Sequence, residues 1–438
     1  MRFFIRFKDL IWAYLLPILF LGHFIIFPTV GIDTENAILH YDYLLFSWET
    51  IGRIGLVGLK KLFFPTGYSP ILNNLIMIIG LGFFLYFVSK KLKVHLIIFS
   101  LTFLSLPITY FQIYFQLQNA EVVFTCLLVV LSAYYFSTST NWYTWLIPIL
   151  IFGFAISVYQ SFLDFIIAST SYFLLQNKDT LKPRLVILKL FLAPCFSLGV
   201  YWLLNHLFNQ QNGNSDYLHI LFLSKVSLLA IVIIVFVTIY FLFELFSKKI
   251  DMSSFFLKSA FYCSPFLTVA AVGNLQYRAL FPTFPFVVGI IFSSIYYGKK
   301  KKLKHFIELS LITFTMITVF LVYQNYRQYQ DDRNLAQTIK KAIPNSDYRV
   351  QFIGKYQGNR IPFIIAGEPV GKSFFWWDPL PSQGRSDNFL KLEGVNYIPS
   401  TIEENQEISQ QSISFYTNPN TSWIQLDDVK KVVYIIFE

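Results

Sequence analysis

Two acidic residues stand directly after the first hydrophobic stretch of the chain. Residues 11–30 are apolar over about the length that crosses a bilayer. Asp33 and Glu35 follow, with one residue between them. Ionisable groups at a membrane are functional by default. A carboxylate here can act as an acid or base on the head group of a lipid-linked substrate. The pair can also serve as oxygen ligands for Mg²⁺ or Mn²⁺, although no third ligand is identifiable.

Further polar side chains lie at the ends of later hydrophobic stretches. Gln160 and Asp164 are four residues apart and therefore share a helix face. Tyr159 precedes them, and Glu121 lies in a polar segment after the third stretch. We expect these residues to bind substrate at the outer membrane surface. The alternative for Asp164 is a hydrogen bond that only joins neighbouring helices.

Two arginines are candidates for binding a phosphate. Arg278 is an isolated cation on the predicted outer side, where positive charge is depleted. A guanidinium matches the geometry of a phosphate group. Arg53 is the second candidate. The alternative for Arg278 is an interfacial residue whose aliphatic part lies in the membrane and whose charge reaches water.

The composition is that of a membrane protein. Of the 438 residues, 55% are hydrophobic and only 14% are charged, against roughly 25% charged in average proteins. The net charge of +10 does not indicate a nucleic-acid partner, because the basic residues cluster in short loops between hydrophobic stretches. Three scattered cysteines within apolar stretches predict neither a disulfide framework nor a metal site.

The hydrophobic stretches predict about eleven transmembrane helices, centred near residues 20, 80, 104, 129, 150, 169, 196, 236, 265, 288 and 315. We place the turn between the fifth and sixth at 157–161. Basic clusters follow the second, sixth, eighth and tenth helices, at 90–93, 178–184, 248–249 and 299–304. The positive-inside rule therefore predicts a multi-pass protein with a cytoplasmic N-terminus and an extracytoplasmic C-terminus.

Two amphipathic helices are expected in the first outer loop. Thr34 can cap a helix whose apolar face is formed by residues three and four apart, from Ile38 to Trp48. Gly52 and Arg53 interrupt the pattern, and 54–64 form a second segment. Both helices would lie along the membrane surface. The alternative is a re-entrant hairpin that has no catalytic role.

The chain divides by composition into a membrane domain, 1–326, and a small extracytoplasmic α/β domain, 327–438. We expect a helix over 332–342, ended by Pro344, and strands over 348–353, 362–366 and 432–437. Residues 366–373 fit a relaxed phosphate-loop pattern, but the aromatic residues that follow are poor helix formers, so nucleotide binding is not expected. Trp376 and Trp377 either pack the core or form a platform for a sugar.

Several short motifs resemble the glucosyl transferase II family. They are the residues 27–35, Trp48, 52–55 and 157–161. The resemblance covers most of the membrane part and leaves the C-terminal domain out. It implies a glycosyltransferase of the GT-C-like class, with an acidic residue after the first span and two juxtamembrane helices in the first outer loop. Such proteins modify bacterial surface polysaccharides, including O-antigen, from a polyprenyl-phosphate-linked sugar.

The resemblance makes Asp33 the leading catalytic acid and Glu35 the next. The expected reaction transfers glucose or a related hexose, with inversion, onto a surface or cell-wall polysaccharide outside the plasma membrane. Asp33 would be the general base, Arg278 or Arg53 would hold the lipid phosphate, and Tyr159, Gln160 and Glu35 would bind the sugar. A polyprenyl-phosphate sugar synthase and a flippase would be functional partners.

Two other classes of protein share this outline. A flippase or transporter of lipid-linked sugars would place ionisable groups near the membrane midplane, on broken helices within internal repeats. The chain has no convincing repeat, and its acidic residues lie at the outer rim. A polysaccharide polymerase or ligase is the enzymatic alternative.

Overall fold

The computed structural model describes residues 2–208, 225–273, 276–298, 301–354, 356, 358, 368, 370–377, 384–401 and 423–437. The chain forms two compact units. The first contains Met1–Pro28 and Asp42–Met316, and the second contains Thr29–Tyr41 and Ile317–Glu438. A segment directly after the first hydrophobic stretch thus belongs to the same unit as the C-terminal residues.

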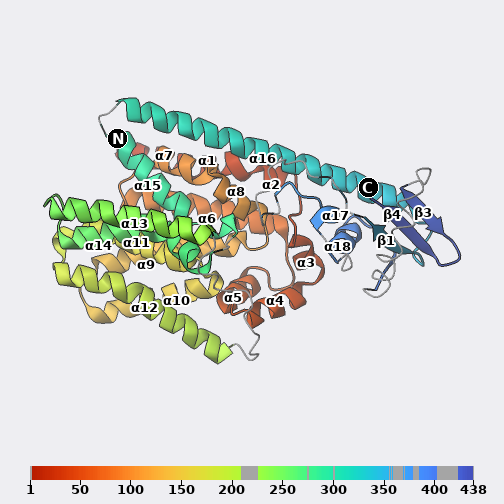
Figure 1. The fold of residues 1–438 in the computed structure, drawn as a ribbon, viewed down its shortest axis with the longest axis horizontal. Coiled ribbons are helices and arrows are strands. Elements are labelled where there is room, and N and C mark those ends of the chain that lie inside the picture. Colours follow the sequence, from red (N-terminus) through yellow and green to blue (C-terminus); the bar gives the residue numbers. More distant parts are fainter. Residues whose placement is uncertain are drawn as a thin grey trace. The chain divides into compact units, whose positions relative to one another are not determined.

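The first unit is a bundle of helices (Figure 1). Its helices are α1 (Arg2–Leu21), α2 (His23–Ile26), α4 (Tyr41–Thr50), α5 (Ile54–Phe63), α6 (Pro70–Lys91), α7 (Leu96–Ser105), α8 (Pro107–Tyr114), α9 (Asn119–Thr138), η1 (Trp142–Trp145), α10 (Leu146–Val158), α11 (Phe162–Asn177), η2 (Lys178–Thr180), α12 (Pro183–Phe208), α13 (Lys225–Phe246), α14 (Met252–Val272), η4 (Tyr277–Leu280), α15 (Thr283–Tyr297) and the start of α16 (Lys301–Ala342).

Among the described residues, six helices are long and apolar enough to cross a membrane: α6, α9, α12, α13, α14 and α16. A seventh crossing is added if α7 and α8 form one broken span, bent by 59°. Pro107, which lacks a backbone N–H, is the first residue of α8 and accounts for the break. Two shorter apolar helices cover Trp142–Val158 and Thr283–Tyr297. The chain is therefore a helical membrane protein by length and composition, whereas eleven crossings remain a prediction.

Burial differs sharply between the helices of the bundle. Helix α9 packs against α6, α10 and α11 and is mostly buried. Helix α13 packs on α14 and leaves most of its apolar side chains exposed, including Phe236 and Phe243. An apolar helix with an exposed apolar surface is typical of a segment that faces lipid. Helix α9 therefore lies in the core of the bundle and α13 at its periphery.

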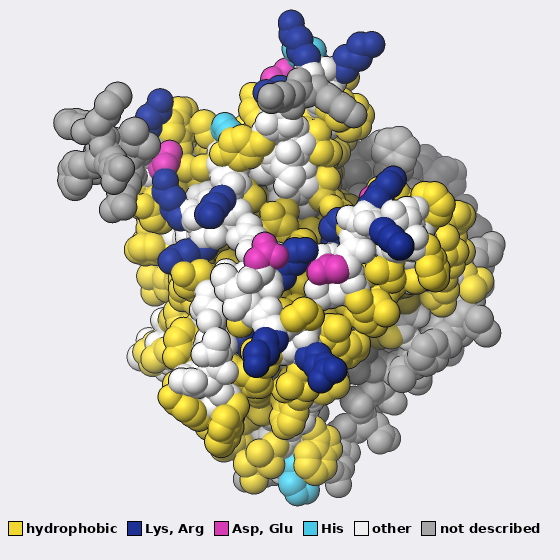
Figure 2. All heavy atoms as spheres, turned by 90° about the vertical axis from the view of Figure 1, so that its left-hand side faces the viewer, with side chains coloured by type: hydrophobic (Ala, Val, Ile, Leu, Met, Phe, Trp, Pro, Cys, Tyr) yellow, Lys and Arg dark blue, Asp and Glu magenta, His cyan; other side chains and the backbone are white. Residues whose placement is uncertain are grey.

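The basic loops of the first unit meet at one end of the bundle. Contacts there join loops that are distant in sequence: Lys90 with Asp9, the His95 ring with the ring of Tyr296, Gln176 with the Leu92 carbonyl, and Lys178 with Asp251. Figure 2 shows Lys and Arg side chains gathered on this face between apolar helix surfaces. The grouping is what the positive-inside rule requires of loops on the same side of a membrane.

The second unit is an α/β fold around a four-stranded sheet of order β2-β1-β4-β3. The strands are β1 (Arg349–Ile353), β2 (Ile398–Pro399), β3 (Ile424–Asp427) and β4 (Val432–Ile436). Strand β1 is parallel to β2 and β4, and β3 is antiparallel to β4. Helices α3 (Thr34–Leu39), α17 (Phe374–Trp377), α18 (Gly384–Leu392) and the end of α16 complete the unit. One core cluster contains Ile32, Ile339, Val350, Phe389 and Val433.

Several sequence predictions are confirmed. The turn at 157–161 separates α10 from α11, and the strands at 348–353 and 432–437 match β1 and β4 within one residue at either end. Helix α16 ends at Ala342, two residues before Pro344, but it runs without a break from Lys301 and does not begin at residue 332. The strand expected at 362–366 lies outside the described residues.

The first outer loop differs from its prediction. The first amphipathic segment is broken at His40 into α3 and α4, whereas the second matches α5. Thr34 is not the cap, because it is the first residue of α3 and Asp33 precedes it as the N-terminal flanking residue. Asp33 has a left-handed backbone (φ 74°), and its side chain makes no capping hydrogen bond. Its carboxylate is bound elsewhere, as described below.

Asp332 is a buried carboxylate in the second unit, on α16 beyond the predicted span. It accepts hydrogen bonds from the Phe374 backbone N–H (3.0 Å) and from Gln328 Nε2 (2.9 Å). Burial raises the pKa of Asp332 from 3.8 to about 7, although the hydrogen bonds from Ser373, Phe374 and Gln328 oppose the shift. The protonated form is therefore favoured by folding.

The first prediction concerns membrane topology. A reporter fused after Lys304 is expected to read as cytoplasmic, because the basic loops gather at that end of the bundle. A reporter fused after Glu438 should read as extracytoplasmic. Fusions assayed in intact cells measure both positions. A cytoplasmic signal from the second fusion would contradict the prediction that the chain crosses the membrane once after Lys304.

The second prediction is a pH dependence of stability. Unfolded Asp332 loses its proton near pH 4, whereas the folded state keeps it to about pH 7. Its contribution to the free energy of unfolding is full below pH 4 and is lost as pH rises through 7. That loss amounts to up to about 4 kcal/mol. The free energy of unfolding of Asp332→Asn, measured relative to that of wild type, should therefore increase as pH rises from 5 to 8.

Thermal unfolding of the full-length protein in detergent at the two pH values measures this difference. Asp347→Asn is the control, because the Asp347 side chain is 64% exposed and pairs with Lys431 at 3.7 Å. A difference between Asp332→Asn and wild type that stays constant from pH 5 to pH 8 would contradict the assignment.

Candidate functional site

Asp33 lies in the second unit, where the chain enters α3. Its left-handed φ of 74° is uncommon for a residue with a side chain, and Asp and Asn are among the few that tolerate it. The neighbouring Ile32 is fully buried in the core of the second unit. This anchor holds the backbone at Asp33, and its side chain remains 32% exposed.

Arg385, in the first turn of α18, binds the Asp33 carboxylate. Its Nε donates to Asp33 Oδ1 at 2.7 Å, and a terminal guanidinium nitrogen lies 2.6 Å from the same oxygen. Among the described residues, Oδ2 has no hydrogen-bonding partner. One oxygen is therefore fixed by a cation and the other is available. Contact between α3 and α18, including a His40–Asn388 hydrogen bond of 3.2 Å, supports this arrangement.

Glu35 lies two residues further along the chain in a different environment. It is in the first turn of α3 and has no exposed surface. A carboxylate enclosed in this way does not reach a substrate in this conformation, so direct sugar binding by Glu35 requires movement of α3. No group of three or more His, Cys, Asp or Glu side chains within the described ranges is arranged to hold a metal ion. A metal bound by Asp33 and Glu35 stays a prediction.

The other predicted site residues belong to the first unit. Arg53 stacks on the Tyr159 ring, with 5.2 Å from its guanidinium carbon to the ring centroid. Gln160 Nε2 donates to the Tyr201 hydroxyl at 3.4 Å. The turn between α4 and α5 thus meets the turn between α10 and α11. Three of the predicted residues, Arg53, Tyr159 and Gln160, form one local cluster.

Gly52 allows this cluster to form. Its φ of 78° lies in the left-handed region, and a Cβ there would meet Asn205 Oδ1 at 2.9 Å and the Tyr201 hydroxyl at 3.2 Å. Both the backbone conformation and the close approach of α12 therefore require glycine. The interruption at Gly52 and Arg53 is a fixed turn and not merely a gap between helices.

Glu121 forms a fully buried ion pair with Lys60. The Lys60 Nζ lies 2.8 Å from Glu121 Oε1, and neither side chain has exposed surface. Lys60 Nζ also donates to the Leu117 carbonyl at 2.6 Å. Its ammonium lies 4.5 Å from the centroid of the Tyr68 ring and 4.9 Å from that of the Phe64 ring. Helices α5 and α9 are thus joined by a desolvated ion pair, and aromatic rings surround its ammonium group.

The loop between α8 and α9 is held by further polar side chains. Gln116 has a left-handed φ of 50°, and its carbonyl accepts hydrogen bonds from Tyr68 and from Asn73 Nδ2, the latter at 2.6 Å. Asn73 Oδ1 accepts from the Ala120 backbone N–H at 3.1 Å. The polar segment that contains Glu121 therefore connects several helices of the bundle through hydrogen bonds.

Arg278 and Asp164 complete the set of predicted residues. The Arg278 guanidinium lies 4.3 Å from the centroid of the Phe115 ring and is partly exposed, so it can reach a ligand. Asp164 is 4% exposed, and its Oδ2 accepts the Thr268 backbone N–H of α14 at 3.2 Å. This contact corresponds to the alternative in which Asp164 joins neighbouring helices.

The phosphate-loop pattern does not have phosphate-loop geometry in its described residues. Helix α17, which follows it, contains four residues. Lys372 is buried, and its ammonium lies 4.9 Å from the centroid of the Trp376 ring. Trp376 itself is partly exposed. Residues 366, 367 and 369 lie outside the described part.

Sequence reasoning missed two residues. Arg385 is 352 positions from Asp33, and no local pattern signals the pairing. Lys60 lies within the segment 54–64, for which only an amphipathic helix is predicted. The signal that distinguishes it is its place on α5: Leu56, Val57 and Leu59 are buried on the same helix, whereas the neighbouring Lys61 is 60% exposed.

Comparisons with known proteins give no match, whether to a family model, to a characterised protein or to a solved structure. The likeness to the glucosyl transferase II family thus rests on the short motifs of the sequence.

The third prediction concerns the buried pair. Lys60→Met leaves the Glu121 carboxylate buried without its counter-ion and should destabilise the protein by about 3–5 kcal/mol. Adding Glu121→Gln should recover much of this loss. Thermal unfolding in detergent of both single variants and the double variant gives the coupling energy.

Lys61→Met is the matched control. It changes the next residue, whose 3.3 Å pair with Glu49 is exposed, so a loss of less than about 1 kcal/mol is expected. Additive effects of Lys60→Met and Glu121→Gln would show that the pair is not coupled.

Proposed function

We propose that the protein is an integral-membrane glycosyltransferase. It transfers a hexose from a polyprenyl-phosphate donor to a hydroxyl of a bacterial surface polysaccharide, on the outer face of the plasma membrane. The observation that carries the proposal is the Asp33 carboxylate, which follows the first apolar helices directly and is bound by Arg385 through one oxygen only. The short helices α3, α4 and α5, which follow it in the sequence, agree with the layout of the family that the motifs resemble.

Asp33 is the proposed general base. The acceptor hydroxyl oxygen attacks the anomeric carbon, and its proton passes to Oδ2 of Asp33. The bond from that carbon to the phosphate oxygen breaks, and polyprenyl phosphate leaves with the electron pair. A single displacement inverts the configuration. Arg385 fixes the direction of the carboxylate, and such orientation within hydrogen-bond reach is what general-base catalysis needs.

Cations are needed where the phosphate leaves, because negative charge develops there. Arg278 and Arg53 are the proposed groups. Each stacks on an aromatic ring, Phe115 and Tyr159 respectively, which limits the motion of the long side chain. Tyr159 and Gln160, next to Arg53, are the proposed contacts for sugar hydroxyls.

The second unit has a defined part in this proposal. It supplies Arg385, which binds the carboxylate of the proposed base, and the core that buries Ile32, which is the residue before it. Neither feature is expected of a module that only binds the polysaccharide. We propose that the C-terminal domain positions Asp33.

The fourth prediction tests Asp33. Asp33→Asn keeps a residue that tolerates the left-handed backbone but removes the base. Transfer should fall by about 10²- to 10⁴-fold. Asp33→Gly should lose activity to the same extent without a loss of stability, because glycine relieves the backbone strain. Arg385→Ala should reduce kcat, and Arg385→Lys should restore part of it.

The measurement is release of free polyprenyl phosphate by membranes supplied with a labelled polyprenyl-phosphate sugar and acceptor glycan. Glu393→Gln is the matched control, because it breaks a second ion pair of the same unit, Arg333–Glu393 at 3.1 Å. Near-normal transfer by Asp33→Asn would exclude Asp33 as the base. Movement of the intact lipid-linked sugar without release of polyprenyl phosphate would indicate a transporter.

A further inference from the structure

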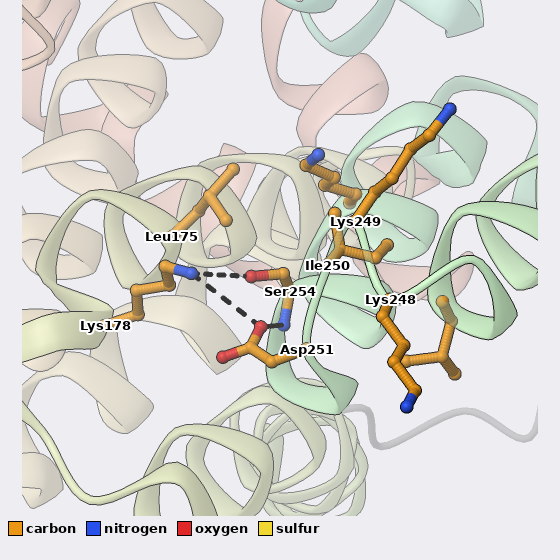
Figure 3. A pocket seen from close by; sticks show the side chains of 9 residues that line it. Leu175, Lys178, Lys248, Lys249, Ile250, Asp251 and Ser254 are labelled. Carbon is orange, nitrogen blue, oxygen red and sulfur yellow. Dashed lines mark hydrogen bonds and ion pairs between the residues drawn. The ribbon is translucent and has the colours of Figure 1, made fainter.

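A basic pocket lies at the lysine-rich end of the first unit, where α11 ends and the chain turns from α13 to α14. Its volume is about 830 Å³. Four lysines line it together with one acidic residue, Asp251 (Figure 3). The lysines are Lys178, Lys248, Lys249 and Lys258. The proposed transferase does not use this pocket.

Only part of this positive charge is neutralised. Lys178 donates to Ser254 Oγ at 2.8 Å and pairs with Asp251 at 3.7 Å, as Figure 3 shows. Lys258 pairs with Glu244 at 3.7 Å. Within the described ranges Lys248 and Lys249 have no acidic partner, and both side chains are exposed. Two ammonium groups at the pocket are therefore available to an anion.

The backbone at Lys248, just beyond the end of α13, has a left-handed conformation. Its φ is 56°, in the left-handed region, and its N–H bonds to the Leu245 carbonyl while that of Lys249 bonds to the Glu244 carbonyl, each at 2.9 Å. This is the helix ending in which glycine is the usual residue. Glycine therefore fits the backbone at Lys248, so Lys248→Gly removes the charged side chain without adding strain.

An apolar pocket adjoins the basic one. It has a volume of about 470 Å³ and lies between α13 and α14. Its lining is mostly aromatic or aliphatic: Phe236, Val237, Tyr240, Phe241 and Tyr262, with Glu244 and Lys258. Lys258 lines both pockets. The cationic pocket and the apolar pocket thus meet at Lys258, and the apolar one is lined by residues of α13 and α14.

We infer that the two pockets together bind an anionic phospholipid. The phosphate of its head group lies among the lysines, and an acyl chain lies in the apolar pocket. Lysine is a common phosphate ligand, and basic pockets between helices at the positively charged side of membrane proteins bind anionic head groups. A soluble phosphate compound would make no use of the apolar pocket.

The test uses the full-length protein in neutral detergent, titrated with phosphatidylglycerol or with phosphatidylcholine of the same acyl chains. Native mass spectrometry measures binding, and thermal unfolding measures its effect on stability. Phosphatidylglycerol is expected to bind more tightly than phosphatidylcholine. Lys248→Gln with Lys249→Gln should weaken its binding roughly 25-fold, about five-fold for each lysine.

Lys93→Gln with Lys302→Gln is the matched control. Both are exposed lysines at the same end of the unit, and Lys93 also has a left-handed φ, of 52°. This variant should retain the affinity for phosphatidylglycerol. Lys248→Gly should raise the melting temperature without lipid and still lose affinity for phosphatidylglycerol, which separates the role of the charge from folding.

Equal loss of affinity in the pocket variant and the control variant would overturn the site, because general surface charge would then explain the binding. Glycerol phosphate is the soluble probe with the same phosphate chemistry. If it bound as tightly as phosphatidylglycerol, the lipid assignment would be wrong and the pocket would be a site for free phosphate compounds.

Discussion

The energetic penalty of removing charge from water determines where the ionisable side chains of the first unit lie. Buried charges are tolerated only with close partners. Lys60 has Glu121 and the Leu117 carbonyl. Lys189, also fully buried, donates to backbone carbonyls at the end of α9, that of Phe136 at 2.6 Å. Most other lysines of the unit gather at one end of the bundle, where their side chains reach the surface, and Lys61 is exposed beside Glu49.

Elements defined by local patterns could be predicted from the sequence. The turn at 157–161, the end of α16 before Pro344 and the strands β1 and β4 follow from a few neighbouring residues. The break at His40 could not, because the apolar spacing continues through it. The exposure of individual lysines could not either: Lys60 and Lys61 are adjacent, yet one is fully buried and the other 60% exposed. Tertiary packing decides such cases.

Three residues at the polar sites have left-handed backbones, whereas Lys93 and Lys431 have the same conformation elsewhere. Asp33, Gln116 and Lys248 all have left-handed φ values. The Asp33 carboxylate binds Arg385, the Gln116 carbonyl receives two side-chain donors, and Lys248 lines the basic pocket. Glycine would fit each backbone with less strain. Glycine at Asp33 would nevertheless lose the ion pair with Arg385, and glycine at Lys248 would remove one charge from the basic pocket.

Composition placed one boundary near residue 326, whereas the second unit also includes Thr29–Tyr41. A short polar segment after an apolar helix has no local feature that assigns it to the same unit as the C-terminal residues. The assignment comes from burial of Ile32 in the core cluster and from the Asp33–Arg385 pair. Both interactions join the beginning of the chain to its end, so the folded C-terminal residues stabilise the conformation at Asp33. A reaction that uses Asp33 therefore depends on residues that no motif in the membrane part reveals.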